Sequence, residues 1–530
     1  MTKRKSVAQV LIGLLLVAAL VLIPIACKAP EVPPVTPEAP PAAPPEEVAP
    51  PEVAPPEEVA PPEEAPVAEV APFRGLADVP EIKNKAPIHL ALAAGGGGED
   101  IKPFIEKFSE YTGVPMTLEL LIMAVQYPKI NLELIGGTGV YDVFVVESAF
   151  TNEWAPYMWN IEELAGQYDP GGVASFRKDM EGYDPGNLRA ASDRAGNLKQ
   201  LPYFTYQQCM SYRQDVFDDP TEQANFKAKY GYELASATTW EQIYDQGEFF
   251  TRKAGGLLKG EVLADDLYGL SMMAGRFEIN DEISARIWGA GGHWATLVRD
   301  EQGNPVEFVI TKKDKEILRD ALESYKSMLK FCAPGCLTGF WDFVAAQFEA
   351  GLTIVTPHQY ICLDPWQRGV EVKVPGAKIG LAPLVGGQGY YGSFCNGTAK
   401  ASKNPEAAYW LVRYLSSYEC QTELAEGGWA NVLRTDVLGN PKYHTGDWPG
   451  LEERADILLD LWENYQTIDV VEDYIHFNSA AMGKIYEIQI ILCHEGAVGM
   501  RTIDETVAEI TKQTMELQTK FGDLPIREEF

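Results

Sequence analysis

Acidic and aromatic side chains stand directly after a predicted buried strand in the first half of the sequence. The strand covers residues 141–146 (YDVFVV), and Glu147, Ser148 and Phe150 follow it. In an open α/β sheet, ligands bind beyond the carboxyl ends of the strands. An ionised carboxylate is a strong hydrogen-bond acceptor, so Glu147 suits a molecule with several hydroxyl groups. The alternative is a solvated loop acid without a ligand.

The sequence contains no catalytic or nucleotide-binding motif in its required structural context. No G-x-S-x-G occurs, and the six histidines are scattered without zinc-ligand spacing. Residues 387–392 spell G-x-G-x-x-G, but the residues after them read as a strand, whereas a dinucleotide site requires a helix there. Acids are abundant, so a pair of carboxylates for glycoside hydrolysis stays open as an alternative. The sequence predicts neither a metal site nor a cofactor.

The overall charge argues against polyanionic partners. The 530 residues carry a formal net charge of −32, which repels nucleic-acid backbones and anionic lipid headgroups. Aromatic residues make up 11% of the chain, enough for a stacking site as well as for a core. The part without the N-terminal segments, roughly 450 residues, is long enough for two domains with substantial cores.

The N-terminus reads as an export signal. Lys3, Arg4 and Lys5 precede an apolar run, residues 10–25, which is short for a membrane span and ends at Ala26-Cys27. The end of this run resembles the cleavage site of bacterial lipoproteins, although Pro24 stands where Leu is usual. We expect residues 1–26 to be removed and Cys27 to be lipidated. The alternative is an uncleaved anchor helix.

A Pro- and Glu-rich segment follows Cys27. Residues 28–72 contain irregular copies of E-E-V-A-P-P and few large apolar side chains. Proline removes backbone donors and the glutamates repel one another, which favours an extended, disordered chain. We therefore expect a tether over residues 27–85, with a reach on the order of 100 Å. The alternative is a ligand for a proline-binding module.

The remaining cysteines leave two interpretations open. Seven cysteines follow Cys27, and Cys332 and Cys336 flank a Pro-Gly turn. In an exported protein this pair could close a small disulfide. The alternative is that these are free buried thiols.

Residues 379–417 (IGLAPLVGGQGYYGSFCNGTAKASKNPEAAYWLVRYLSS) carry a resemblance to a known family. A strand, a Gly-rich aromatic loop, a second strand and a helix beginning at Pro405 follow one another, as in the hinge region of the maltose-binding-like, family 1 solute-binding proteins of ABC importers. The T-T-W-E sequence from Thr238 is similar to a second family motif. The resemblance implies a mixed α/β periplasmic-binding-protein type II fold, in which a multi-strand hinge joins two α/β lobes. It places the N-terminal lobe at residues 86–202 and 384–432, and the C-terminal lobe at 203–383 and 433–530.

The resemblance also implies which residues meet the ligand. Tyr206 and Gln207 would lie at the first crossing between lobes, and Trp288 would offer a stacking face, although a core position fits it equally. Residues 427–434 lack the proline that the family usually has in this loop, and Arg213-Gln214-Asp215 replaces its Asn-Lys-Asp. The further candidates are His358, Tyr360, Tyr391, Ser393, Trp429 and Asn431.

The function that the resemblance implies is capture of a sugar or oligosaccharide outside the cell. The protein would be a monomeric lipoprotein without enzymatic activity, anchored to the outer face of the cytoplasmic membrane. It would deliver its ligand to the permease subunits of an ABC importer. Two alternatives stay open, an extracytoplasmic glycoside-acting enzyme and a sensor of the same fold with a non-sugar ligand such as a polyamine or glycerol phosphate.

Overall fold

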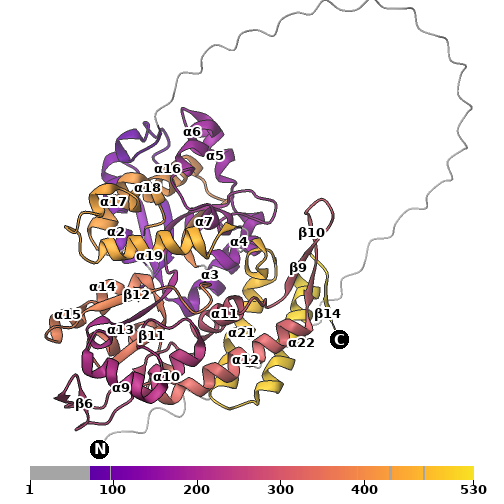
Figure 1. The fold of residues 1–530 in the computed structure, drawn as a ribbon. Coiled ribbons are helices and arrows are strands. Elements are labelled where there is room, and N and C mark those ends of the chain that lie inside the picture. The colour runs from indigo at the N-terminus through magenta and orange to yellow at the C-terminus, as the bar shows by residue number, and fades with distance from the viewer. Residues whose placement is uncertain (1–71, 96, 391, 429–431, 469–471, 530) are drawn as a thin grey trace, which may run out of the picture. The chain divides into compact units, whose positions relative to one another are not determined.

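Two β-sheets form the centre of the structure. The computed structural model describes residues 72–95, 97–390, 392–428, 432–468 and 472–529 (Figure 1). The chain divides into Met1–Val67 and a compact unit, Ala68–Phe530, to which everything below refers. The predicted signal peptide, lipidated Cys27 and most of the tether lie outside the described residues.

The first sheet has five strands in the order β2-β1-β3-β13-β4. β1 pairs in parallel with β2 and β3, whereas β13 is antiparallel to both β3 and β4. The bounds are β1 Ile88–Ala93, β2 Met116–Leu121, β3 Val143–Glu147, β4 Gln200–Thr205 and β13 Ser393–Thr398. Strands that are distant in the sequence are therefore neighbours, and the carboxyl ends of β1 and β3 share one edge. We call the part of the molecule built on this sheet the first lobe.

The second sheet has four strands in the order β12-β5-β11-β8. β5 is antiparallel to β11 and β12, and β11 is parallel to β8. The bounds are β5 Gln208–Arg213, β8 Tyr268–Leu270, β11 Thr353–Tyr360 and β12 Ile379–Ala382. We call the part built on this sheet the second lobe. Only Tyr206 and Gln207 separate β4 from β5, so the chain passes directly from the first sheet to the second.

Two smaller sheets lie away from this crossing. The C-terminal β14, Ile526–Glu528, pairs in parallel with β10, Pro305–Ile310, which is antiparallel to β9, Thr296–Arg299. A short hairpin joins β6, Leu257–Leu258, to β7, Glu261–Val262.

Helices cover both main sheets. In Figure 1, α2, α5, α6 and α16 lie with the first sheet, and α10 and α13 lie with the second, whereas α12 packs against α11, α21 and α22. Before β5 the helices are α2 Gly98–Thr112, α3 Met123–Gly136, α4 Thr151–Trp154, α5 Ile161–Tyr168, α6 Gly172–Met180 and α7 Pro185–Ala190. Between β5 and β12 they are α8 Gln214–Phe217, α9 Pro220–Tyr230, α10 Trp240–Phe250, α11 Ile279–Gly289, α12 Lys312–Met328, α13 Trp341–Glu349, α14 Asp364–Gln367 and α15 Gly369–Lys373. After β13 they are α16 Pro405–Leu415, α17 Tyr418–Glu426, α18 Thr435–Leu438, α19 Leu451–Asn464, α21 Met482–Ala497 and α22 Ile503–Phe521.

The helix that the sequence predicts at Pro405 is present as α16. Asn404 caps it by accepting a hydrogen bond from the Ala407 amide at 3.3 Å, and Pro405 occupies the first turn, where its missing N–H costs nothing. Every side chain from Ala407 to Leu415 is buried. The strand β13 follows the G-x-G-x-x-G residues, as predicted, so they do not open a helix.

The folded part begins earlier than predicted. We expected the tether to continue to residue 85, but Phe73, Leu76 and Ile82 are buried. The Phe73 ring lies 5.6 Å from that of Trp410, and the Leu76 amide donates to Glu419 at 2.8 Å. Residues 73–85 therefore pack on the first lobe, because their few large apolar side chains are enough to hold them there.

The predicted lobe bounds differ from the observed ones at two places. β4 continues to Thr205, so the first lobe extends past residue 202, and the chain crosses at Tyr206 and Gln207, as the resemblance implied. The segment after residue 432 was assigned to the second lobe. However, Arg434 forms an ion pair with Asp179 of α6 at 2.9 Å, so this segment returns to the first lobe before α19 begins.

Two further findings concern the membrane and the thiols. In the part of the chain that the structure describes, no helix combines the length and the apolar character that a membrane span needs. The seven cysteines after Cys27 are free, so the Cys332–Cys336 disulfide is not formed in this structure.

Candidate ligand-binding site

A cavity of about 370 Å³ lies where strand ends of the two main sheets meet. Ala94 follows β1 and Glu147 ends β3, while Tyr360 ends β11 of the second sheet. Tyr206, in the crossing between the lobes, also lines the cavity. Its volume is in the range of small-molecule sites, and its position agrees with the rule that ligands bind beyond the carboxyl ends of strands.

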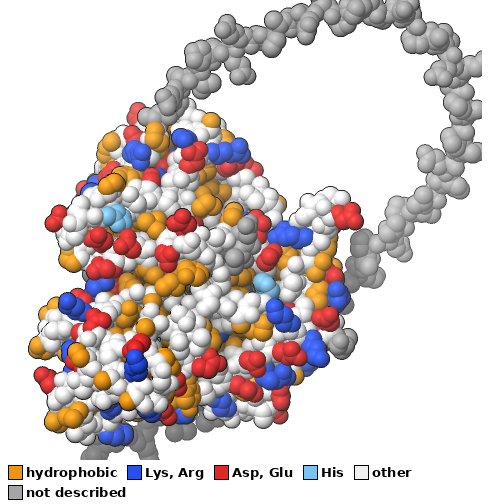
Figure 2. Space-filling view, in the orientation of Figure 1, with side chains coloured by type: hydrophobic (Ala, Val, Ile, Leu, Met, Phe, Trp, Pro, Cys, Tyr) orange, Lys and Arg blue, Asp and Glu red, His pale blue; other side chains and the backbone are white. Residues whose placement is uncertain are grey.

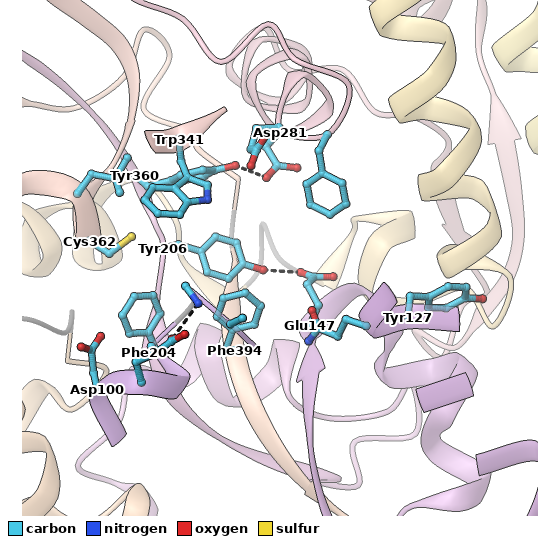
Figure 3. A pocket seen from close by; sticks show the side chains of 18 of the residues that line it. Asp100, Tyr127, Glu147, Phe204, Tyr206, Asp281, Trp341, Tyr360, Cys362 and Phe394 are labelled. Carbon is cyan, nitrogen blue, oxygen red and sulfur yellow. Dashed lines mark hydrogen bonds between the residues drawn. The ribbon is translucent and has the colours of Figure 1, made fainter. Parts of the chain in front are cut away.

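Aromatic rings form most of the cavity wall. Figure 3 shows Tyr206 between Trp341 and Tyr360 on one side and Phe204 and Phe394 on the other. The Tyr206 ring is perpendicular to that of Tyr360, with centroids 5.7 Å apart, and tilted against that of Phe394 at 4.9 Å. The other aromatic lining residues are Tyr127, Phe150, Phe277, Trp366 and Tyr486. Such faces suit the apolar C–H surfaces of a ring or chain.

The charges of the cavity are all of one sign. Six carboxylates line it, whereas no Lys, Arg or His is present among its described lining residues. On the molecular face in Figure 2, by contrast, basic side chains lie among the acidic ones. The six acids are Glu99, Asp100, Glu147, Glu278, Asp281 and Glu487.

Glu147 is held by neutral donors. It accepts hydrogen bonds from the hydroxyls of Tyr206 at 2.8 Å and Tyr390 at 3.2 Å, and from the Ala149 amide at 3.0 Å. Burial raises the pKa of the Glu147 carboxyl to about 7, although these hydrogen bonds act in the opposite direction. The carboxyl group is therefore near its titration point at neutral pH, and its charge responds to any ion placed beside it.

Asp281 and Glu278 lie in the second lobe, at and just before the start of α11. Asp281 accepts from the hydroxyls of Tyr360 at 2.5 Å and Tyr486 at 2.7 Å, and burial raises its pKa to about 8. Burial also raises the pKa of Glu278 to about 8. Its Oε2 atom has no hydrogen-bond partner among the residues that the structure describes, although the side chain is only 6% exposed. Glu278 is thus a buried acceptor that the folded chain leaves unsatisfied.

Four of the residues predicted from the sequence line the cavity: Glu147, Phe150, Tyr206 and Tyr360. Ser148 and Gln207 are fully buried beside it. The Ser148 hydroxyl lies 3.3 Å from a Glu147 oxygen, and Gln207 accepts a hydrogen bond from the Trp462 indole at 3.1 Å. Both residues position the wall rather than form it.

The structure places three other candidates outside the cavity lining. Trp288 stacks on Tyr474, with ring centroids 4.1 Å apart, which is the core position left open above. His358 is buried against Trp240 at 5.1 Å. Ser393 donates to Asn187 at 2.9 Å. Each side chain makes its contacts within the protein core and is not among the residues that face the cavity.

The last three candidates, Tyr391, Trp429 and Asn431, lie outside the described residues.

Sequence reasoning missed Glu278, Asp281 and Tyr486. The signal that could have found the two acids is their i, i+3 spacing, which places them on one helix face. In the described residues, no group of three or more His, Cys, Asp or Glu side chains is arranged to hold a metal ion.

The fold has counterparts among known structures. A ribitol-bound ABC transporter solute-binding protein from Agrobacterium radiobacter K84 is 15% identical, with a TM-score of 0.63 over 83% of this chain and 100% of that one. A maltose-bound protein of T. maritima, MalE3, is 18% identical, with a TM-score of 0.60 over 82% of this chain and 100% of that one. At these identities the likeness shows the fold, which confirms the predicted periplasmic-binding-protein architecture.

Sequence comparison gives one curated relative and one family. The erythritol/L-threitol-binding protein of Mycolicibacterium smegmatis is 35% identical over 66 residues, which are 12% of this chain and 14% of that protein. The match is therefore short, and the chain covers only a small part of that relative. Residues 94–422 match the family described as bacterial extracellular solute-binding protein. This match spans more than half of the sequence, and the chain therefore belongs to that family of extracytoplasmic solute-binding proteins.

Proposed function

We propose that this protein captures a small polyhydroxylated solute, a sugar or a polyol, and delivers it to the permease of an ABC importer. The observation that carries the proposal is the cavity, because both lobes line it and a chain crossing lies in its wall. Its aromatic faces suit the C–H surfaces of such a solute, and its carboxylates suit the hydroxyls. The related proteins with ribitol and maltose bound, and the short match to an erythritol/L-threitol-binding protein, support the same ligand class.

The mechanism that follows is closure of the two lobes around the solute. Tyr206 links them directly, since its hydroxyl bonds Glu147 of the first lobe and its ring contacts Tyr360 of the second. A solute that contacts residues of both lobes binds the closed state more tightly than the open one and shifts the population toward it. The Gly-rich loop between β12 and β13 forms the second crossing. A Cβ on Gly392 would lie 1.8 Å from the Tyr206 ring, so only glycine lets this loop pass so close to it.

The place of action is outside the cytoplasm, as membership of the family implies. We propose that Cys27 carries the lipid anchor, that the Pro- and Glu-rich segment after it spans the distance to the membrane, and that the protein acts as a monomer. The solute leaves chemically unaltered, because proteins of this family bind for transport.

Isothermal titration calorimetry with ribitol, mannitol, erythritol and maltose tests the proposal. We expect saturable binding of at least one member, recovery of that solute unchanged by mass spectrometry, and a smaller radius of gyration in X-ray scattering. Tyr206→Phe removes the hydroxyl at the crossing and is expected to weaken binding about five- to tenfold, on the order of 1 kcal/mol. The matched control is Tyr111→Phe, whose side chain is 54% exposed and outside the cavity. Absence of binding to any sugar or polyol, or conversion of a bound one, contradicts the proposal.

A further inference from the structure

We propose that the solute carries a protonated primary or secondary amine beside its hydroxyl groups, as an amino sugar or an amino polyol does. This inference rests on the proposed function and specifies the class of ligand for the same cavity. It follows from three features: the sign of the charges, the hydrogen-bonding groups left without partners, and the rings around them.

The excess of negative charge is not compensated by the chain. All six charged side chains in the described cavity lining are acidic. The eight residues between 72 and 529 that the structure leaves undescribed are Gly96, Tyr391, Trp429, Ala430, Asn431, Asp469, Val470 and Val471, and none of them is basic. Burying several carboxylates without a counter-ion is costly, and a cationic ligand removes that cost.

Three basic residues close in the sequence to cavity-lining residues are engaged elsewhere. Arg276, two residues before Glu278, pairs with Glu495 at 3.9 Å, outside the cavity lining. Arg286 of α11 lies over the Trp240 ring at 3.8 Å and donates to Ser324 at 2.9 Å. Lys484 of α21 pairs with Glu153, outside the cavity lining. The groups that face Asp281 from the packed elements are the hydroxyls of Tyr360 on β11 and Tyr486 on α21, together with the negative charges of Glu147 and Glu282. The donors among them are neutral, so they satisfy the hydrogen bonds of Asp281 but not its charge.

Two lining side chains have an atom without a hydrogen-bond partner among the described residues, one an acceptor and the other a donor. Glu278 is an acceptor without a donor at Oε2, and Gln126 is a donor without an acceptor at Nε2. Both side chains are more than nine-tenths buried. A single solute satisfies both if it has an N–H or O–H donor for Glu278 and a hydroxyl or ether oxygen for Gln126. A charged N–H makes the stronger hydrogen bond to a carboxylate, which favours an amine over a further hydroxyl. A quaternary ammonium ion has no N–H and leaves Glu278 unsatisfied.

The rings around the acids also favour a cation. Phe277 and Tyr486 line the cavity with Asp281, and Tyr360 bonds it directly. The face of an aromatic ring attracts an ammonium group, most strongly where water is excluded. Burial raises the pKa of Glu278 and of Asp281 to about 8, so an ammonium group that binds near neutral pH lowers these pKa values and releases protons.

Calorimetry on matched sets of solutes tests the inference. Three sets, in the glucose, galactose and mannose series, each contain the neutral sugar, its 2-amino form and the N-acetylated amine. A fourth set is the pair sorbitol and 1-amino-1-deoxysorbitol. The amine of at least one set is expected to bind more than about tenfold tighter than its neutral members. Titrations in two buffers of different ionisation enthalpy are expected to show proton release with the amine and none with the neutral sugar.

Glu278→Gln keeps the shape of the side chain and removes its charge. It is expected to reduce the advantage of the amine over the neutral member of its set by about tenfold. Glu301→Gln, in the exposed turn between β9 and β10, is the matched control and is expected to bind as the parent protein does. If Glu278→Gln does not fold, the proton-release titrations on the parent protein test the inference in its place.

The outcomes separate this inference from the proposed function. Neutral sugars or polyols that bind as tightly as their amines overturn the inference and leave the proposed function standing. Tighter binding of choline, putrescine or calcium chloride than of every hydroxylated amine also overturns it. If no member of any set binds, the proposed function fails and the inference fails with it.

Discussion

Buried carboxylates have opposite surroundings in two regions of the molecule. In the first lobe, Asp179 lies between two buried arginines, Arg413 at 2.7 Å and Arg434 at 2.9 Å. At the edge of the second sheet, burial tends to raise the pKa of Asp215, but Arg213 and Lys259 lower it to about 2. In these places the chain supplies the cation that the acid requires.

Among the residues that the structure describes, no such cation pairs with the cavity acids. Glu147 and Asp281 are bonded to tyrosine hydroxyls, and Glu278 has an unpartnered oxygen. Where a buried acid stabilises the fold, the chain therefore provides an arginine or a lysine that neutralises it. Where the acid faces the cavity, neutralisation is left to a proton or to a ligand. A pair of variants that shift stability in opposite directions can therefore distinguish the two regions.

The largest effect is expected from Arg413→Met. The substitution keeps much of the volume but leaves Asp179 buried with one cation fewer, and we expect the free energy of unfolding to fall by about 3–5 kcal/mol. Urea unfolding followed by tryptophan fluorescence measures it. Arg177→Met is the matched control, because Arg177 pairs with Glu162 while 68% of its side chain is exposed, and its loss is expected to cost less than about 1 kcal/mol. Equal midpoints for the two variants would show that the buried arginine does not hold the first lobe.

The next effect has the opposite sign. Because burial raises the pKa of Glu278 to about 8 while the unfolded chain ionises near its ordinary pKa, the folded protein loses stability as the pH rises from that ordinary value to about 8. Glu278→Gln avoids this loss. We expect the variant to gain about 1–3 kcal/mol at about pH 9 and almost nothing at about pH 4. Destabilisation at both pH values would mean that Glu278 has a partner in solution, and the contrast with Asp179 would disappear.

Local sequence signals were sufficient to predict individual strands and helices and one of the cavity acids. The predicted strand that precedes Glu147 is β3, and the helix predicted from Pro405 is α16. Glu147 was found because a strand end is a local feature of the sequence, and its place in an open sheet is a general rule.

The second lobe's share of the site depends on contacts between distant segments. Glu278, Asp281 and Glu282 resemble the polar face of a surface helix, yet every described side chain from Ile279 to Trp288 is buried. Burial of this face follows from α12 and α21, which lie later in the chain and pack against α11. The resemblance implied a stacking face at Trp288, and the contact with Tyr474 that makes it a core residue joins segments far apart in the sequence.

A smaller effect is expected at Tyr360, which links an aromatic face to an acid. Tyr360→Ala is expected to weaken solute binding about tenfold, about 1.4 kcal/mol, because it removes the ring. Since its hydroxyl bonds Asp281 and the side chain is only 5% exposed, this variant also loses stability. Tyr360→Phe keeps the ring and is expected to weaken binding about threefold or less. Titration calorimetry on both variants, with Tyr111→Ala as the exposed control, measures these losses. Unchanged affinity in Tyr360→Ala would remove this residue from the site.

The smallest effect concerns the unmodified protein and the pH. The pKa values of Glu147, Glu278 and Asp281 are raised to about 7, 8 and 8, so the stability that their neutral forms provide is fully present below their ordinary pKa values and is lost as the pH rises from there to about 8. We expect the melting temperature of the ligand-free protein to fall by a few degrees over this range. A hydroxylated amine replaces the lost protons, so the increase in melting temperature that it produces should grow with pH, whereas the increase produced by a neutral sugar should stay constant. Differential scanning fluorimetry with both solutes makes the comparison. Repulsion among surface acids changes with pH in both complexes alike. If the increase in melting temperature depends on pH in the same way for the amine and the neutral sugar, the cavity acids do not interact with the charge of the amine.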